Sequence, residues 1–253
     1  MADSVQSLDR ALSILELLSD FEEGLGLLEI SSKLSLHKST AHRLLASLIQ
    51  NGYVEQNQST NKYKLTFKLF ELGNKKVEKM DILTLAKPYL TDLMEQTNET
   101  VHLVIRENKD IVYISKVESS NTIRMISSIG KKSPMYCTAV GKAILANLPE
   151  VEVNHIWSNT EINKLTEYTI TDLNKLKEEL KKIKERGFAI DEEENELGVR
   201  CIGAVIYDHQ GNPNAAISIS GPATRMTDEK IVDSARLLLQ QSMKISKELG
   251  YRN

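Results

Sequence analysis

Apolar residues recur at helical spacing in three stretches near the start of the chain. The apolar positions of the first stretch, residues 5–19, are Val5, Leu8, Leu12, Leu15 and Leu18. A spacing of three or four residues predicts an amphipathic helix, with Ser7 as a candidate cap. The same spacing predicts helices over residues 27–34 and 38–51, separated by a short turn, and Gly52 is a typical C-terminal stop.

The pattern changes after Gly52 to short alternations of apolar and polar residues. Residues 53–55 and 63–65 flank a polar tip at 57–61, which predicts a small hairpin. Helix, turn, helix and hairpin follow one another over residues 27–66. This order is typical of a winged helix-turn-helix, which inserts its second helix into the major groove of DNA.

Residues 67–97 are helical by pattern, and Pro88 is expected in the first turn of a new helix. From Thr100 onward strand patterns dominate. We expect strands within 101–107, 111–119, 121–130, 198–208 and 214–221, and helices over 138–147, 171–186 and 227–249. The chain therefore divides into a winged helix-turn-helix (1–73), a linker helix (74–87) and an α+β domain (88–253).

The charge is distributed unevenly. The chain of 253 residues has a net charge of -3, which argues against a general polyanion binder. Between Ser31 and Lys68, however, six bases face one acid, Glu55, and this surplus suits a phosphate backbone. Neither a signal peptide nor a membrane span is expected, so we predict a cytoplasmic protein.

The second helix of the pair begins with polar residues that suit DNA. Hydroxyl groups near a helix N-terminus bind phosphate, and an arginine reads guanine edges. The predicted DNA contacts in this helix are Lys38, Ser39, Thr40, His42 and Arg43. The hairpin adds Lys62, Tyr63 and Lys64, and the first helix adds Arg10.

These segments resemble a known family. VQSLDRALSILELL, LLEISSKLSLHKSTAHRLLASLIQNGYV and KYKLTFKLFELG are similar to the DNA-binding domain of IclR-type transcriptional regulators. VYISKVES, SPMYCTAVGKAILANLP, LTEYTITD, ERGFAIDEEENELGVRCIGAVIYD and AAISISGPATR resemble its effector-binding domain. The resemblance runs from Val5 to Gly250, and its SGPxxR and GVRCI segments are distinctive.

The resemblance implies a GAF-like C-terminal domain that binds a small carboxylate effector, an organic or sugar acid, and requires no cofactor. It implies a homodimer or homotetramer on a palindromic operator in double-stranded DNA, most often as a repressor of a catabolic operon. The effector residues carried over from the family are Thr138, Ala139, Val140, Gly141, Asp191, Cys201, Ser218 and Ser220. MYCTAVGKAILA resembles the subgroup that controls hexuronate and pectin catabolism through keto-deoxy sugar acids.

Physical arguments support these positions. Consecutive N–H groups at the start of a helix favour an anion. Ser218 and Ser220 lie two apart on a strand and therefore face the same side. The first helix and the linker helix (74–87) each carry an apolar stripe, and together the stripes exceed what a small domain buries alone. We therefore predict that these two helices form the dimer contact.

Two other readings stay open from the residues alone. Cys137, near a helix N-terminus, with His102, His155 or His209 would make a cysteine hydrolase, although no third group that would orient a dyad is evident. We therefore expect no enzyme, and ligand spacing for a metal is also lacking. Alternatively, the second domain only oligomerises and binds no ligand.

Overall fold

The computed structural model describes residues 5–77, 82–121 and 128–252. The chain divides into two compact units, residues 1–79 and 80–253. The strand predicted over 121–130 falls largely on residues 122–127, which lie outside the described residues. Within the described residues, no helix is both long enough and apolar enough to span a membrane.

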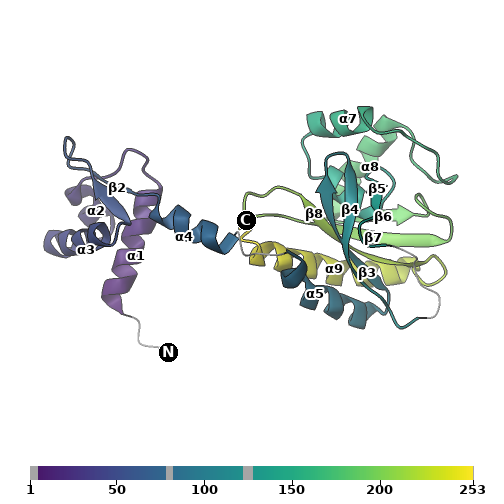
Figure 1. Cartoon of the computed structure of the whole chain (residues 1–253), viewed down its shortest axis with the longest axis horizontal. Coiled ribbons are helices and arrows are strands. Elements are labelled where there is room, and N and C mark those ends of the chain that lie inside the picture. Colours follow the sequence, from purple (N-terminus) through teal and green to yellow (C-terminus); the bar gives the residue numbers. More distant parts are fainter. Residues whose placement is uncertain (1–4, 78–81, 122–127, 253) are drawn as a thin grey trace. The chain divides into compact units, whose positions relative to one another are not determined.

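The first unit is a winged helix-turn-helix, as predicted (Figure 1). Its elements are α1 (Gln6–Ser19), α2 (Leu27–Lys33), α3 (Lys38–Gln50), β1 (Val54–Gln56), β2 (Tyr63–Leu65) and α4 (Lys68–Val77). Strands β1 and β2 pair antiparallel. The core is formed by Ile14, Leu18, Leu25, Ile30, Leu44, Leu45, Leu48, Val54 and Tyr63.

The turns of this unit follow from particular residues. Gly52 has a φ of +76°, a left-handed conformation that lets the chain leave α3 without a Cβ penalty. The start of α1 differs from the prediction, because Val5 is its N-cap residue and Ser7 lies inside the helix. Gly26, at the start of α2, donates its N–H to Glu29 at 2.7 Å, which caps that helix with a carboxylate.

In its described residues, the second unit is built on one six-stranded antiparallel sheet in the order β5-β4-β3-β8-β7-β6. The strands are β3 (Thr100–Glu107), β4 (Asp110–Val117), β5 (Lys132–Pro134), β6 (Ala189–Glu192), β7 (Val199–Ile206) and β8 (Ala215–Pro222). Because β3 lies beside β8, segments more than a hundred residues apart meet at the centre of the sheet. The predicted α+β class is confirmed.

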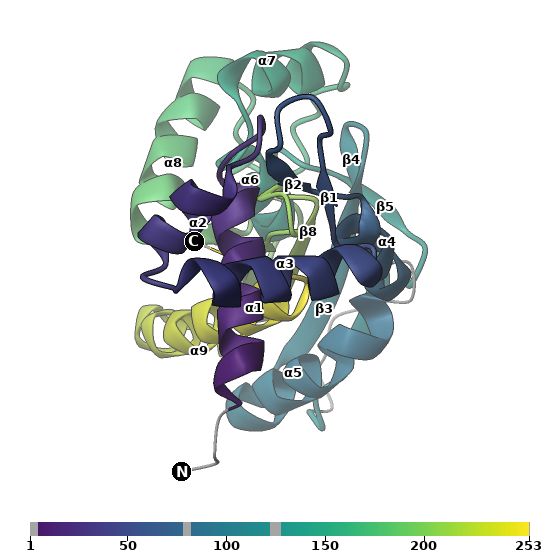
Figure 2. The same cartoon turned by 90° about the vertical axis from the view of Figure 1, so that its left-hand side faces the viewer.

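Helices cover both faces of this sheet. The helices are α5 (Ile82–Thr97), α6 (Ala139–Leu145), α7 (Glu150–Ser158), α8 (Leu173–Arg186) and α9 (Asp228–Glu248). Helices α5 and α9 lie side by side on one face. Figure 2 shows α6 and α8 on the other side of β8 from α9. Alternation along the strands therefore gives each face its own core.

One predicted helix start was wrong. Pro88 lies inside α5, after Ile82, and not in its first turn. The linker border predicted between residues 87 and 88 consequently falls within a continuous helix. Packing compensates for the missing N–H of the proline, since Ala86, Leu90 and Leu93 are buried against the sheet.

Candidate nucleic-acid interface and effector site

Helix α3 has one apolar face and one polar face. Ala41, Leu44, Leu45 and Leu48 are buried. Lys38, Ser39, His42 and Arg43 are exposed and Thr40 is half-buried. The N-cap residue His37 makes no side-chain cap bond and the first turn carries no acid. The start of α3 therefore has N–H groups suited to a phosphate.

The wing exposes fewer of the predicted side chains than expected, and Tyr63 corrects the prediction. Its side chain is 5% exposed and belongs to the core. Its backbone pairs with Leu25, with N–O distances of 2.8 and 3.0 Å, which anchors the wing to the loop before α2. The Tyr63 side chain therefore cannot face DNA. Of the flanking lysines, Lys62 is half-buried and Lys64 is exposed.

Some of the local basic surplus is neutralised within the unit. Lys64 forms an ion pair with Glu55 at 3.1 Å, and Lys68 forms one with Glu71 at 3.2 Å. Lys33 lies over the ring of Phe21, 5.0 Å from its centroid. Arg10, on α1, is half-buried. Lys38, Arg43 and Lys62 are therefore the bases best placed for phosphate or base contacts.

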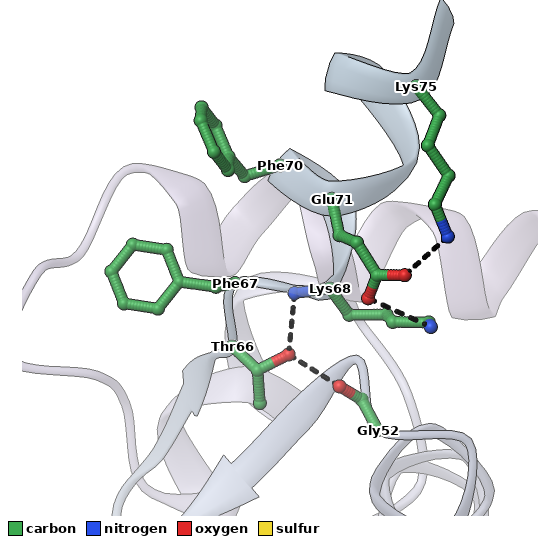
Figure 3. Close-up of a pocket in the computed structure, with 7 residues that line it drawn as sticks. All are labelled: Gly52, Thr66, Phe67, Lys68, Phe70, Glu71 and Lys75. Atoms are coloured by element: carbon green, nitrogen blue, oxygen red, sulfur yellow. Dashed lines mark hydrogen bonds and ion pairs between the residues drawn. The ribbon is translucent and has the colours of Figure 1, made fainter.

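An aromatic surface at the start of α4 was not predicted. Phe67 is 87% exposed and Phe70 is 69% exposed. They border an open hollow of about 680 Å³ beside Gly52, Thr66 and Glu71, and Figure 3 shows both rings away from the ion pairs that Glu71 makes with two lysines. Thr66 fixes this segment by donating to the Gly52 carbonyl at 2.5 Å.

In the second unit, the strand register assembles the predicted effector residues on the face that carries α6. Asp191 pairs with Cys201, and Cys201 pairs with Ser220 on the next strand. Ser218 pairs with Gly203 on one side and with His102 on the other. The side chains of Asp191, Cys201, Ser218, Ser220 and His102 form a polar layer on this face of the sheet.

The start of α6 lies directly over this layer. A Cβ at Gly203 would come within 2.7 to 2.8 Å of backbone atoms of Ala139 and Val140, so only glycine permits this approach. Thr138 caps the helix and accepts the Gly141 N–H at 3.2 Å. The Gly141 amide predicted for the effector is therefore occupied, and Ala139 and Val140 carry the amides without a hydrogen bond among the described residues.

His102 is a member of the layer that the sequence prediction did not place there. Its Nδ1 lies 3.4 Å from the hydroxyl oxygens of both Ser218 and Ser220, and its ring meets Tyr113 edge to face at 5.2 Å. Burial, aided by the charge of Lys116, lowers the pKa of His102 to about 4. The imidazole is therefore neutral at pH 7, and the tautomer decides whether its Nδ1 accepts a hydrogen bond from the serines or donates one to them.

Asp191 is the titratable acid of this layer. Burial raises the pKa of Asp191 to about 7, against the opposing charge of Lys142. Its Oδ1 accepts the Glu194 N–H at 2.8 Å. A carboxyl group in this state can donate to an oxygen of a bound molecule when protonated and accept from a hydroxyl when ionised.

The cysteines do not suit catalysis. Cys137 is fully buried, and desolvation with the charges of Asp191 and Glu194 raises its pKa to about 12, so the thiolate is disfavoured. Burial also raises the pKa of Cys201. In the chain as described, no group of three or more His, Cys, Asp or Glu residues could hold a metal ion.

The distinctive motifs act structurally in this fold. Arg200 of the GVRCI segment forms two bonds to Glu192, at 2.6 and 2.7 Å, and a third to Asp228 at 2.8 Å. Arg225 of the SGPATR segment donates two hydrogen bonds to the carboxylate of the buried Glu99, at 2.8 and 2.7 Å. Arg200 ties β7 to β6 and to the start of α9, and Arg225 ties the turn after β8 to the segment before β3, so both arginines maintain the sheet that positions the polar layer.

Comparison with known proteins agrees with both units. A family model for the bacterial transcriptional regulator IclR C-terminal region matches residues 74–247, and the IclR helix-turn-helix domain matches residues 7–58. The chain is 37% identical over 251 residues to the HTH-type transcriptional regulator KdgR of Escherichia coli (strain K12), covering 99% of this chain and 95% of KdgR.

Other relatives extend this similarity. The transcriptional repressor IclR of the same strain is 33% identical over 248 residues, covering 97% of this chain and 90% of that protein. The crystal structure of the Agobacterium tumefaciens repressor BlcR superposes with a TM-score of 0.80 at 30% identity, covering 100% of both chains. The chain belongs to the IclR family of DNA-binding transcriptional regulators.

Proposed function

We propose that this regulator represses a catabolic operon and is released from its operator by a small carboxylate effector bound in the polar layer of the second unit. The observation that carries the proposal is that layer itself. Ser218, Ser220 and Asp191 are buried polar side chains beneath two unbonded amides of α6. The amides suit a carboxylate, and the buried hydroxyl and carboxyl side chains suit hydroxyl groups. The layer therefore favours a ligand that carries both a carboxylate and hydroxyl groups.

A keto-deoxy sugar acid has this composition. Its carboxylate would meet the Ala139 and Val140 amides, and its hydroxyls would bond with Ser218, Ser220 and Asp191. Cys201 would contribute a small polarizable wall. The resemblance of residues 135–146 to the subgroup that responds to such acids supports the same choice.

On the DNA side, we propose that a homodimer or homotetramer presents two copies of α3 to a palindromic operator in the cytoplasm. Three exposed apolar residues support self-association of the first unit: Val5, which caps α1, and Leu8 and Leu12 on that helix. The exposed rings of Phe67 and Phe70 extend the apolar surface available for it. An effector changes operator affinity only if it binds one conformation more tightly than the other.

A thermal-shift screen with keto-deoxy, aldonic and uronic acids and with pyruvate tests the effector. We expect stabilisation by a keto-deoxy acid, lost in the Ser218→Ala, Ser220→Ala double variant but kept in Ser234→Ala, a buried serine on α9. Operator binding should survive in the double variant. If no acid stabilises the wild-type chain, the second unit serves oligomerisation alone.

A further inference from the structure

The buried charges beside the polar layer are unbalanced. Lys142 on α6 is 1% exposed, Glu194 is 5% exposed and Asp191 is 3% exposed. Lys142 Nζ forms an ion pair with Glu194 Oε1. The other oxygen, Glu194 Oε2, is buried with no hydrogen-bond partner in the described part of the chain. Two buried carboxyl groups thus share one ammonium group, and one carboxyl oxygen is left unsatisfied.

The backbone holds these groups in fixed positions. Asp191 Oδ1 accepts N–H groups from Glu194 at 2.8 Å and from Asn195 at 3.4 Å. The hydroxyl of Thr169 donates to the backbone carbonyl of Glu194 at 2.7 Å. The hydroxyl of Thr166 donates to the backbone carbonyl of Glu193 at 2.7 Å. The backbone that carries both carboxyl groups is therefore held in place, and a change of protonation would relieve the repulsion that a further negative charge brings.

The other titratable groups that face the cluster do not supply a second positive charge. These groups come from the elements packed around the cluster. They are Cys137 before α6, Cys201 on β7, Tyr113 on β4, Glu179 on α8 and Glu196 after β6. The thiols and the phenol have raised pKa values and are neutral at pH 7. Glu179 is paired with Arg186 at 2.7 Å.

We propose that binding of a carboxylate effector is coupled to the uptake of a proton by the Asp191–Glu194 pair. This coupling rests on the proposed function, because it concerns the same site. The effector would bring a third negative charge to a cluster that holds one ammonium group. The proton comes from the solvent and stays on a carboxyl oxygen, while no covalent bond of the effector changes.

The direction of the pH dependence follows. Burial raises the pKa of Asp191 to about 7, so its carboxyl contributes stability that is full below its ordinary pKa near 4 and is lost as the pH rises through 7. The effector binds the protonated form, so its affinity should also fall as the pH rises. Between pH 7 and pH 8 the affinity should fall roughly fivefold, because the protonated fraction of Asp191 falls from about a half to about a tenth.

Isothermal titration calorimetry of the full chain tests the coupling. The probe is 2-keto-3-deoxygluconate, titrated at one pH in two buffers with different enthalpies of ionisation. At pH 7 we expect uptake of roughly half a proton per bound ligand, because about half of the Asp191 carboxyls already hold one, and more at pH 8. Asp191→Asn should bind without proton uptake, and Glu248→Gln, an exposed acid on α9 away from the cluster, should behave as wild type.

Two outcomes separate the coupling from the proposed function. Binding with equal enthalpy in both buffers overturns the coupling and leaves the effector site intact, whereas binding of no acid overturns the proposed function and the coupling together. Glu194→Gln serves if Asp191→Asn does not fold. With Glu194 neutral, Lys142 is free to stabilise ionised Asp191, so carbon NMR of the Asp191 carboxyl should show a lower titration midpoint than in wild type. An unchanged midpoint would also contradict the coupling.

Discussion

Lys38 and Lys142 carry the same ammonium group in opposite surroundings. Lys38 is exposed at the start of α3, where water screens it and a phosphate can replace that water. Lys142 is buried under the sheet and paired with one acid. The difference separates two uses of charge within one chain. Exposed charges attract a partner at little cost to the fold, whereas buried charges must be balanced within it and respond to any new charge.

The strongest test of this contrast removes each lysine. Lys142→Ala leaves Glu194 and Asp191 without their cation, and loss of one partner of a buried pair costs about 3–5 kcal/mol. Lys38→Ala should change the free energy of unfolding by less than about 0.5 kcal/mol. Urea unfolding followed by the fluorescence of Trp157, the single tryptophan, reports on Lys142→Ala in the second unit, and far-UV circular dichroism, to which helices of both units contribute, reports on Lys38→Ala in the first. A loss below about 1 kcal/mol in Lys142→Ala would mean that the pair is screened by water.

The control for that test replaces the whole pair. Apolar residues of similar volume, in Lys142→Met with Glu194→Leu, remove both charges of the ion pair, and the remaining Asp191 carboxyl is mostly neutral at pH 6 because burial raises its pKa to about 7. Such replacements are often neutral or stabilising. Recovery of stability in the double variant would show that charge imbalance, and not lost packing, destabilises Lys142→Ala.

A smaller effect distinguishes two bases of the first unit. Arg43→Ala should weaken binding to an operator, selected in vitro from random duplexes, by about 1–3 kcal/mol and relax base preference at one position. Lys62→Ala should weaken binding to all sequences alike. It should also reduce the slope of the logarithm of DNA affinity against the logarithm of salt concentration by about one. Fluorescence anisotropy over a salt series measures both. An equal loss on all sequences in Arg43→Ala would make Arg43 a phosphate contact.

The two regions also differ in how far the sequence alone predicts them. The polar face of α3 follows from the spacing of Leu44, Leu45 and Leu48, because a helix fixes its faces locally. The burial of Tyr63 depends on pairing with Leu25, which no local pattern indicates. The prediction therefore placed the recognition helix correctly and misassigned one wing residue.

Prediction was weaker for the second unit because its site is assembled from distant segments. Within TAVGKAILAN, Lys142 reads as a solvated residue, and its partner Glu194 lies 52 positions further along. His102 could have been noticed, since alternation in VHLVIRE places a polar residue on an inward face. The four-residue strand β6, which carries Asp191, is too short for a periodic signal.

The smallest predicted effect concerns the ion pair in the wing. Glu55 neutralises Lys64 at 3.1 Å, so Glu55→Gln should free that lysine for phosphate. Stability should change by only about 0.2–1 kcal/mol, because the pair is exposed. The slope of DNA affinity against salt should steepen by up to about 0.9, the contribution of one added phosphate contact. Glu22→Gln, an exposed acid outside the wing, matches the change in net charge. If both variants steepen the slope equally, the gain reflects the overall charge of the unit, and the wing lysine makes no defined contact with DNA.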